Sequence, residues 1–203
     1  MPKHLIIFGD RTASEMEAVA LEVYSNEFAR IVKCYVNPDD LSLEPGVQLP
    51  NAKDTSVFYV IGVLELSLKL RVEQMCQARG YEPWTLVHPS AYVPNSAKIG
   101  KGCFIAPHVA IGIEAIVGDH TIVHFHASVG HGAKVGRHCA ILPGARLSGR
   151  VVIGDGVLVG SNAFVYQGTK VGDNAQIDAL TYVKEDLPPR RVVSVRRDSS
   201  LKG

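Results

Sequence analysis

A strict period of six organises the apolar positions in the second half of the chain. From Val87 to Pro188 the sequence divides into seventeen consecutive hexads without insertions, and each hexad begins with Val, Ile or Leu. The fifth residue of most hexads is a small Ala, Cys or Thr. An α-helix cannot keep such a period on one face, because it has 3.6 residues per turn. The repeat predicts a parallel β-helix, in which three hexads form one triangular coil and the first and fifth residues point inward.

The first 80 residues follow a different pattern, in which apolar strands alternate with amphipathic helices. The predicted elements are strands over residues 5–8, 31–36 and 57–61 and helices over residues 13–28 and 67–79. We expect Ser14 to cap the start of the first helix and Gly80 to cap the end of the second. Strands that alternate with helices predict a small parallel sheet.

The change of period indicates two domains and a tail. We predict a small α/β domain over residues 1–80, with a three-stranded, Rossmann-like parallel sheet, and an all-β helix domain over residues 81–188. Residues 189–203 form a polar C-terminal tail that we expect to be loosely held. The end coils of a β-helix need caps, because each coil is covered only by its neighbours. The α/β domain is a candidate cap.

Composition limits the kinds of partner that we expect the protein to bind. The chain has 203 residues, 46% of them hydrophobic, and 21 basic residues nearly balance 20 acidic ones, so we expect no nucleic-acid partner. The start of the chain lacks the apolar region of a signal peptide, and no apolar run is long enough to cross a membrane, so we expect no membrane partner. Four cysteines without close spacing indicate a reducing compartment, and we expect the cytoplasm.

Three motifs carry a resemblance to one family of enzymes. They are Leu86-Val-His-Pro-Ser-Ala91 at the domain junction, Val129-Gly-His131 with Val135-Gly136 after it, and the stretch from Pro143 to Gly154 that contains Leu-Ser-Gly. They resemble hexapeptide-repeat sugar acyltransferases that O-acetylate sialic acid or N-acetylate UDP-4-amino sugars of the bacillosamine pathway. The resemblance implies a left-handed β-helix, acetyl-CoA as co-substrate, a nucleotide-sugar substrate, and a homotrimer with active sites at subunit interfaces.

His131 is the candidate general base, chiefly because of this resemblance. It is third in its hexad, an outward position, and Gly149 stands one coil further along the chain. Acyl transfer from a thioester needs a base for the attacking amine or hydroxyl and a donor for the oxyanion. Histidine suits the first role near neutral pH, and we expect the Gly149 N–H to lie near the thioester oxygen. Direct attack needs no covalent enzyme intermediate. The alternative is a surface histidine beside a turn glycine.

Other outward residues are weaker candidates. Glu114 stacks under Gly132, so its carboxylate is a candidate to orient the His131 ring, although a solvated surface Glu is a simpler interpretation. By register with the family, Ser161 and Ala179 are expected to touch the CoA arm along the same face as Gly149.

Substrate contacts are expected in both domains. Ligands of open α/β sheets bind at the carboxyl ends of the strands, and Arg11 there is suited to a phosphate. The residues at these ends are Gly9, Asp10, Arg11, Asn37 and Gly62. In the β-helix, His124 and His126 are candidate substrate contacts near a subunit interface. The alternatives are solvated histidines and an α/β domain that binds nothing.

We expect no metal. His126 and His131 have the five-residue spacing of two zinc ligands in the trimeric β-helix carbonic anhydrases, but the position that would hold the third ligand is Ser90.

The leading hypothesis is an acetyl-CoA-dependent N-acetyltransferase that acts on a nucleotide-linked amino-deoxysugar. Sialic-acid-type O-acetylation is the near alternative. A non-catalytic trimeric scaffold or binding protein is the alternative of another class, because Gly132 replaces the acidic residue that follows the catalytic histidine in the family.

Overall fold

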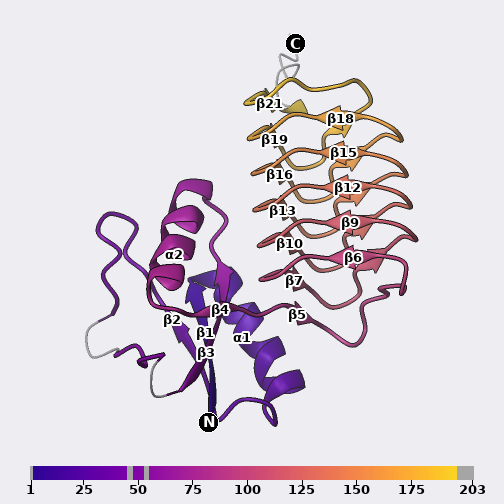
Figure 1. The fold of residues 1–203 in the computed structure, drawn as a ribbon. Coiled ribbons are helices and arrows are strands. Elements are labelled where there is room, and N and C mark those ends of the chain that lie inside the picture. The colour runs from indigo at the N-terminus through magenta and orange to yellow at the C-terminus, as the bar shows by residue number, and fades with distance from the viewer. Residues whose placement is uncertain (1, 45–47, 53–54, 196–203) are drawn as a thin grey trace, which may run out of the picture.

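The computed structural model describes residues 2–44, 48–52 and 55–195. An α/β unit comes first, and a three-sided prism of stacked β coils follows it (Figure 1). No helix in these described ranges is long and apolar enough to span a bilayer.

The α/β unit contains one more strand than the sequence predicts. Its elements are β1 (Lys3–Gly9), α1 (Arg11–Tyr24), β2 (Arg30–Cys34), β3 (Ser56–Gly62), α2 (Leu66–Ala78) and β4 (Glu82–Pro83). The sheet has the order β2-β1-β3-β4, and all its strands are parallel. The short β4 pairs with β3, so the sheet extends beyond residue 80.

Both helix starts differ from the prediction. The first helix begins at Arg11 rather than at residue 13, and its N-cap is Asp10, which makes no side-chain capping bond. Ser14 lies inside the helix, where its hydroxyl donates to the Asp10 carbonyl over 3.2 Å. The second helix is capped by Glu65, whose carboxylate accepts from the backbone N–H of Ser67 and of Leu68. Gly80 lies beyond the C-cap, with a φ of +73°.

The prism has three sides, each a stack of two-residue parallel strands. The first side contains β5 (Leu86–Val87), β7 (Phe104–Ile105), β10 (Ile122–Val123), β13 (Ala140–Ile141), β16 (Leu158–Val159), β19 (Gln176–Ile177) and β21 (Val192–Val193). The second side contains β8 (Ala110–Ile111), β11 (Ser128–Val129), β14 (Arg146–Leu147), β17 (Phe164–Val165) and β20 (Tyr182–Val183). The third side contains β6 (Lys98–Ile99), β9 (Ile116–Val117), β12 (Lys134–Val135), β15 (Val152–Ile153) and β18 (Lys170–Val171).

The hexad rule describes the interior of the prism correctly. Paired residues of adjacent coils are 18 positions apart, as in Ile105, Val123 and Ile141, and these side chains are fully buried. The fourth residue of most hexads has a positive φ, for example +60° at Gly132 and +56° at Asn162. Glycine, asparagine and histidine recur at this position, since these residue types tolerate left-handed backbone better than most.

The start of the predicted tail belongs to the prism. Val192 and Val193 form β21, which pairs with β19 and extends the first side by one strand. This segment is therefore held by backbone hydrogen bonds, contrary to the expectation of a loose tail, because it continues the same parallel ladder. The rest of the tail, residues 196–203, lies outside the described residues.

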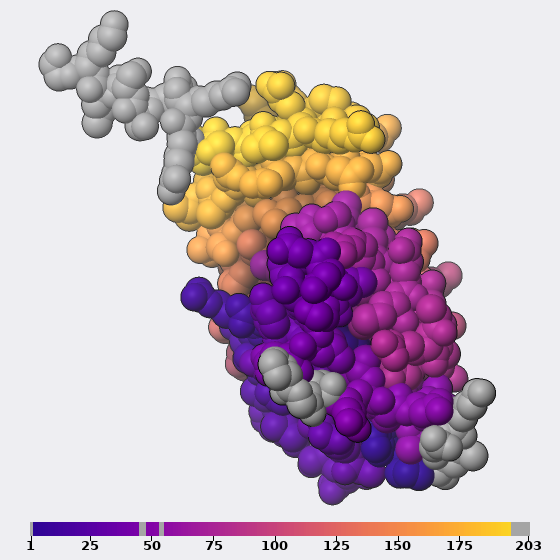
Figure 2. Space-filling view, turned by 90° about the vertical axis from the view of Figure 1, so that its left-hand side faces the viewer, coloured from indigo at the N-terminus to yellow at the C-terminus, as the bar shows by residue number. Residues whose placement is uncertain are grey.

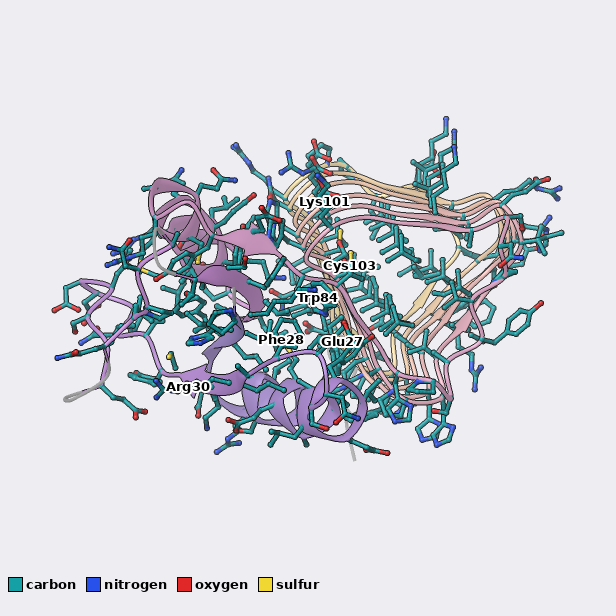
Figure 3. The ribbon with its side chains drawn as sticks, turned by 60° about the horizontal axis from the view of Figure 1, so that its bottom comes forward. Glu27, Phe28, Arg30, Trp84, Lys101 and Cys103 are labelled. Atoms are coloured by element: carbon teal, nitrogen blue, oxygen red, sulfur yellow. The ribbon has the colours of Figure 1, made fainter. Side chains whose placement is uncertain are left out.

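The α/β unit lies against the first side of the prism rather than over its end. Trp84, in the connection between β4 and β5, makes edge-to-face contacts with Phe28 and Phe58 at ring-centroid distances of 5.1 and 5.2 Å. The Tyr24 hydroxyl of α1 donates to the Val87 carbonyl over 3.0 Å. Trp84 and Phe28 lie where the α/β unit meets the prism (Figure 3). The unit crosses the lower coils, while the upper coils stand clear of it (Figure 2).

Candidate active site

The turns between the sides form three corners, and the outward histidines divide among them. The first corner, between the first and second sides, includes residues 106–109, 124–127, 142–145, 160–163 and 178–181. The second corner, between the second and third sides, includes residues 112–115, 130–133, 148–151 and 166–169. The third corner, between the third and first sides, includes residues 100–103, 118–121, 136–139, 154–157 and 172–175.

His131 lies on the second corner with its side chain exposed to solvent. Its ring packs against the backbone of Gly149 in the next coil, because a Cβ added to Gly149 would come within 2.5 Å of Nε2 of His131. The N–H of Arg150 donates to the His131 carbonyl over 2.8 Å and fixes the spacing of the two coils. The missing side chain of Gly149 therefore provides the space that the imidazole occupies.

Glu114 is also exposed on the second corner, but nothing ties its carboxylate to the imidazole. Within the described ranges, no hydrogen bond or ion pair joins Glu114 to His131, and the Glu114 N–H bonds to Ser96 Oγ at 3.3 Å. The atom nearest to a Cβ built on Gly132 is Cγ of Arg150, at 3.5 Å. The orienting role of Glu114 stays a prediction.

Ser161 and Ala179 do not share a corner with His131 and Gly149. Both lie at the first corner, where Ala179 borders a pocket of about 420 Å³ together with Leu180 and Val195. The expectation that they continue the face of Gly149 is therefore wrong. Ser161 stands twelve residues after Gly149, which is two thirds of an 18-residue coil and carries the chain to another corner.

A pocket of about 300 Å³ lies where β1 and β3 end. Four of the five expected α/β residues line it, together with apolar side chains, and these four are Gly9, Asp10, Arg11 and Gly62. Asn37 does not line the pocket, and its Oδ1 accepts the Asp39 N–H over 2.8 Å within a turn. The structure thus gathers most of the predicted substrate residues of this domain.

Two glycines allow α1 to begin at the edge of this pocket. A Cβ on Gly9 would lie 2.7 Å from the Gly62 carbonyl oxygen, and a Cβ on Gly62 would lie 2.6 Å from the backbone nitrogen of Ala13. This close packing brings the first turn of α1, which no side chain caps, to the pocket wall. An uncapped helix N-terminus favours an anionic group.

His124 and His126, at the first corner, have different surroundings. The His124 ring is buried, with Nδ1 accepting the Phe125 N–H over 3.0 Å and Nε2 lying 3.0 Å from Oε2 of Glu15 in α1. Both ring nitrogens are thus already occupied, and burial lowers the pKa of this imidazole. His126 is exposed and stacks on His108 at a centroid distance of 5.1 Å. Neither ring lies at the corner of His131.

Sequence reasoning missed a buried cluster at the third corner. His120 and His138 stand at outward hexad positions, yet α2 covers them and places Lys69 and Glu73 against them. The available signal was the spacing of Lys69 and Glu73, four residues apart on one helix. Among the described residues, no group of three or more His, Cys, Asp or Glu side chains is arranged to hold a metal ion.

Comparison with known proteins shows the same architecture. Residues 150–184 match the hexapeptide repeat of succinyl-transferase. The acetyltransferase domain of PglB from Neisseria gonorrhoeae is 22% identical with a TM-score of 0.79, and the alignment covers 95% of this chain and 96% of that domain. PerB from Caulobacter crescentus, solved with CoA and GDP-perosamine, is 23% identical with a TM-score of 0.79, and the alignment covers 93% and 92% of the two chains.

A third solved structure extends the comparison. WeeI from Acinetobacter baumannii is 14% identical with a TM-score of 0.78, and the alignment covers 94% of this chain and 96% of that one. No curated protein matches the chain in sequence. The chain therefore has the fold of these proteins, an α/β domain followed by a left-handed hexapeptide-repeat β-helix, and the predicted fold class is confirmed.

Proposed function

We propose that the protein is an acetyl-CoA-dependent N-acetyltransferase whose substrate is a nucleotide-linked amino-deoxysugar. The observation that carries this proposal is the exposed imidazole of His131 seated on the bare backbone of Gly149. A ring in this position is accessible to a substrate and is held from one side. Solved structures with the same fold include one with acetyl-CoA and one with CoA and GDP-perosamine.

The proposed reaction is a direct acyl transfer. The sugar amine attacks the thioester carbonyl carbon, so that a C–N bond forms and the C–S bond breaks. A ring nitrogen of His131 takes the proton that the amine loses and delivers it to the departing sulfur, which leaves as the CoA thiol. Backbone N–H groups near Gly149 are candidates to stabilise the oxyanion between these two steps.

The nucleotide is assigned to the pocket of the α/β unit. Its apolar walls, with Tyr35 and Leu68, suit a base or ribose, while Arg11 and the uncapped start of α1 suit a diphosphate. The supporting observation is the convergence of Gly9, Asp10 and Arg11 on one cavity.

The geometry of one chain favours an active site shared between copies. The α/β unit lies on the first side of the prism, whereas His131 lies on the opposite corner, between the other two sides. A sugar bound in the α/β pocket therefore reaches an imidazole of another subunit, in a homotrimer with interface active sites. Exposed apolar side chains on the two free sides and the second corner supply contact area for it: Ile113, Ile116, Val152, Phe164 and Tyr182. The free, buried cysteines agree with a cytoplasmic location.

Thiol release with acetyl-CoA tests the proposal. We expect rapid release with a nucleotide-linked amino-deoxysugar, a product heavier by one acetyl group on nitrogen, and little release with the matched sugar that carries a hydroxyl in place of the amine. Release with only the hydroxyl sugar would favour the O-acetyltransferase. Tight nucleotide-sugar binding without thiol release over a panel of amino sugars would favour the non-catalytic scaffold.

A further inference from the structure

Four polar side chains are buried together where α2 crosses the third corner of the prism. Lys69, Glu73, His120 and His138 have exposed fractions of 0, 7, 4 and 8%. Two come from α2 and two from consecutive coils of the β-helix. The cluster therefore joins the two domains through polar contacts, and the reaction proposed above uses none of its members.

Glu73 links the two imidazoles. Its Oε1 lies 3.3 Å from Nε2 of His120, and its Oε2 lies 3.2 Å from Nε2 of His138. The two rings are stacked with centroids 5.3 Å apart and planes within 5° of parallel. Tyr59 of β3 stacks on His120 at 5.7 Å. One carboxylate thus holds two adjacent coils against the α/β unit.

Lys69 completes the contact one helical turn before Glu73. Its Nζ donates to the carbonyl oxygens of His120 and His138 over 3.2 and 3.4 Å. Burial lowers the pKa of this ammonium group to about 8. The side chain therefore adds positive charge beside the two rings at neutral and acidic pH.

The cluster accommodates neutral imidazoles and opposes charged ones. A hydrogen on Nε2 of either ring has a Glu73 oxygen at 3.2–3.3 Å to accept it, and a neutral imidazole with its hydrogen on Nε2 has none on Nδ1. In the described part of the chain, both Nδ1 atoms are buried and have no hydrogen-bond partner. A second proton on either ring would therefore place a buried N–H without an acceptor and a cation beside Lys69.

We propose that Glu73, His120 and His138 form a proton-operated latch that holds the α/β unit on the prism at neutral pH and releases it in acid. When the rings gain protons, two stacked imidazolium groups face each other, and they share a single buried carboxylate at their Nε2 atoms. Opening the contact returns both rings to water, where their charge is solvated.

Groups of positive and of negative charge surround the buried cluster. The remaining groups that bear on the cluster are the guanidinium of Arg137, the carboxylates of Asp119 and Asp155, the phenol of Tyr59 and the thiols of Cys103 and Cys139. Arg137 lies 3.7 Å from Glu73 and 3.9 Å from Asp119, so it neutralises acidic charge at the mouth of the cluster. The two aspartates favour protonated imidazoles, but burial outweighs them. It lowers the pKa of His120 and of His138 to about 4.

The sign of the pH dependence follows from these directions. A solvated histidine has a pKa near 6.5, so the open state binds more protons than the closed state between about pH 6.5 and pH 4. The stability of the closed contact is complete above this window and falls as the pH falls through it. Glu73 acts in the opposite direction, because burial raises the pKa of its carboxyl in the closed state. Two imidazoles outweigh one carboxyl, and each net proton changes the closed-to-open ratio by about tenfold per pH unit.

A groove gives water access to the latch. It has a volume of about 450 Å³ and lies between α2 and the third corner, and Glu73, Arg137 and His138 are among its lining residues. Protons therefore reach the cluster without unfolding of the prism. At the first corner, His124 and Glu15 form a similar contact with α1, in which Nδ1 of His124 accepts a backbone N–H and so also opposes a second proton.

Hydrogen exchange of the full chain at pH 7.5 and pH 4.5, corrected for the intrinsic pH dependence of exchange, tests the latch. We expect protection of α2 and of β7, β10 and β13 to fall in acid, while the second and third sides of the prism keep theirs. In the double variant His120→Gln/His138→Gln, protection of α2 should lose its pH dependence, because glutamine does not titrate, whereas the contact of α1 with His124 is unchanged. The control His108→Gln/His126→Gln removes the stacked, exposed pair of the first corner. In this variant, α2 should lose protection in acid as it does in the wild type.

Equal acid release in the wild type and the His120/His138 variant, or unchanged α2 protection in the wild type down to pH 4.5, would overturn the proposal. Titration of the histidine rings by NMR gives a second reading on the unaltered protein, should the double variant fail to fold. We expect the rings of His120 and His138 to remain neutral at pH 5.5. Titration of these two rings near pH 6.5 with the α/β unit still docked would contradict the latch.

Discussion

The His131→Asn variant is expected to transfer acetyl groups about 10³-fold more slowly than the wild type, because a general base contributes roughly 10²–10⁴-fold to rate. Asparagine fits in the space above Gly149 but cannot accept the proton that the amine loses. The loss should therefore appear in kcat, with little change in the KM for acetyl-CoA.

The control for this variant is His108→Asn, which removes another exposed imidazole from the first corner. It should retain wild-type turnover, and both proteins should unfold at the wild-type temperature, because neither side chain is buried. Turnover of His131→Asn within a few-fold of the wild type would remove His131 from the mechanism.

Gly149→Ala is expected to reduce turnover by about 10²-fold, because a displacement of a catalytic group by about 1 Å can have that effect. The new methyl group would lie 2.5 Å from Nε2 of His131, well inside van der Waals contact, so the ring must swing away from the backbone. His131 is exposed and free to move into solvent, so the fold should survive. Turnover and thermal unfolding, measured on the same preparation, separate the two effects.

Ser148→Ala is the matched control, since it alters the adjacent position of the same corner without adding an atom near the ring. It should turn over as the wild type does. A Gly149→Ala variant with full activity would show that the position of the imidazole over this glycine has no part in the reaction.

The prism could be predicted from the sequence because the hexad period is a local property of the chain. Positions such as Ile105 and Val123 recur at the same inward place in every coil, so that one rule describes the whole interior. The same period predicts that His131 faces outward and that Gly149 lies one coil away. The structure agrees with both placements, since the ring and the glycine are in contact.

The predictions that failed concern features that depend on contacts between unlike segments of the chain. The hexad rule gives the direction of His120 and His138 but cannot say that α2 will cover them, because no repeat relates α2 to the prism. Likewise, the start of α1 at Arg11 depends on the close packing of Gly9 and Gly62 against Ala13 rather than on a capping side chain. Such tertiary contacts leave little trace in local patterns.

The arrangement also separates, within one chain, the groups that the proposed reaction needs. Within a single chain, the α/β pocket and His131 lie on different sides of the prism, and Ser161 and Ala179 lie on yet another corner. A subunit interface would bring corners of different chains together. We therefore propose that acetyl transfer takes place between subunits, with the nucleotide held by one copy and the base supplied by another.

A crystal structure of the protein with CoA and a nucleotide-linked amino sugar tests this claim most directly. We expect the sugar amine within hydrogen-bond reach, about 3 Å, of a ring nitrogen of His131. We also expect the CoA sulfur beside Gly149 of the same chain and the nucleotide in the α/β pocket of a neighbouring copy. A CoA thiol bound at either of the other two corners, remote from every His131 in the assembly, would contradict it.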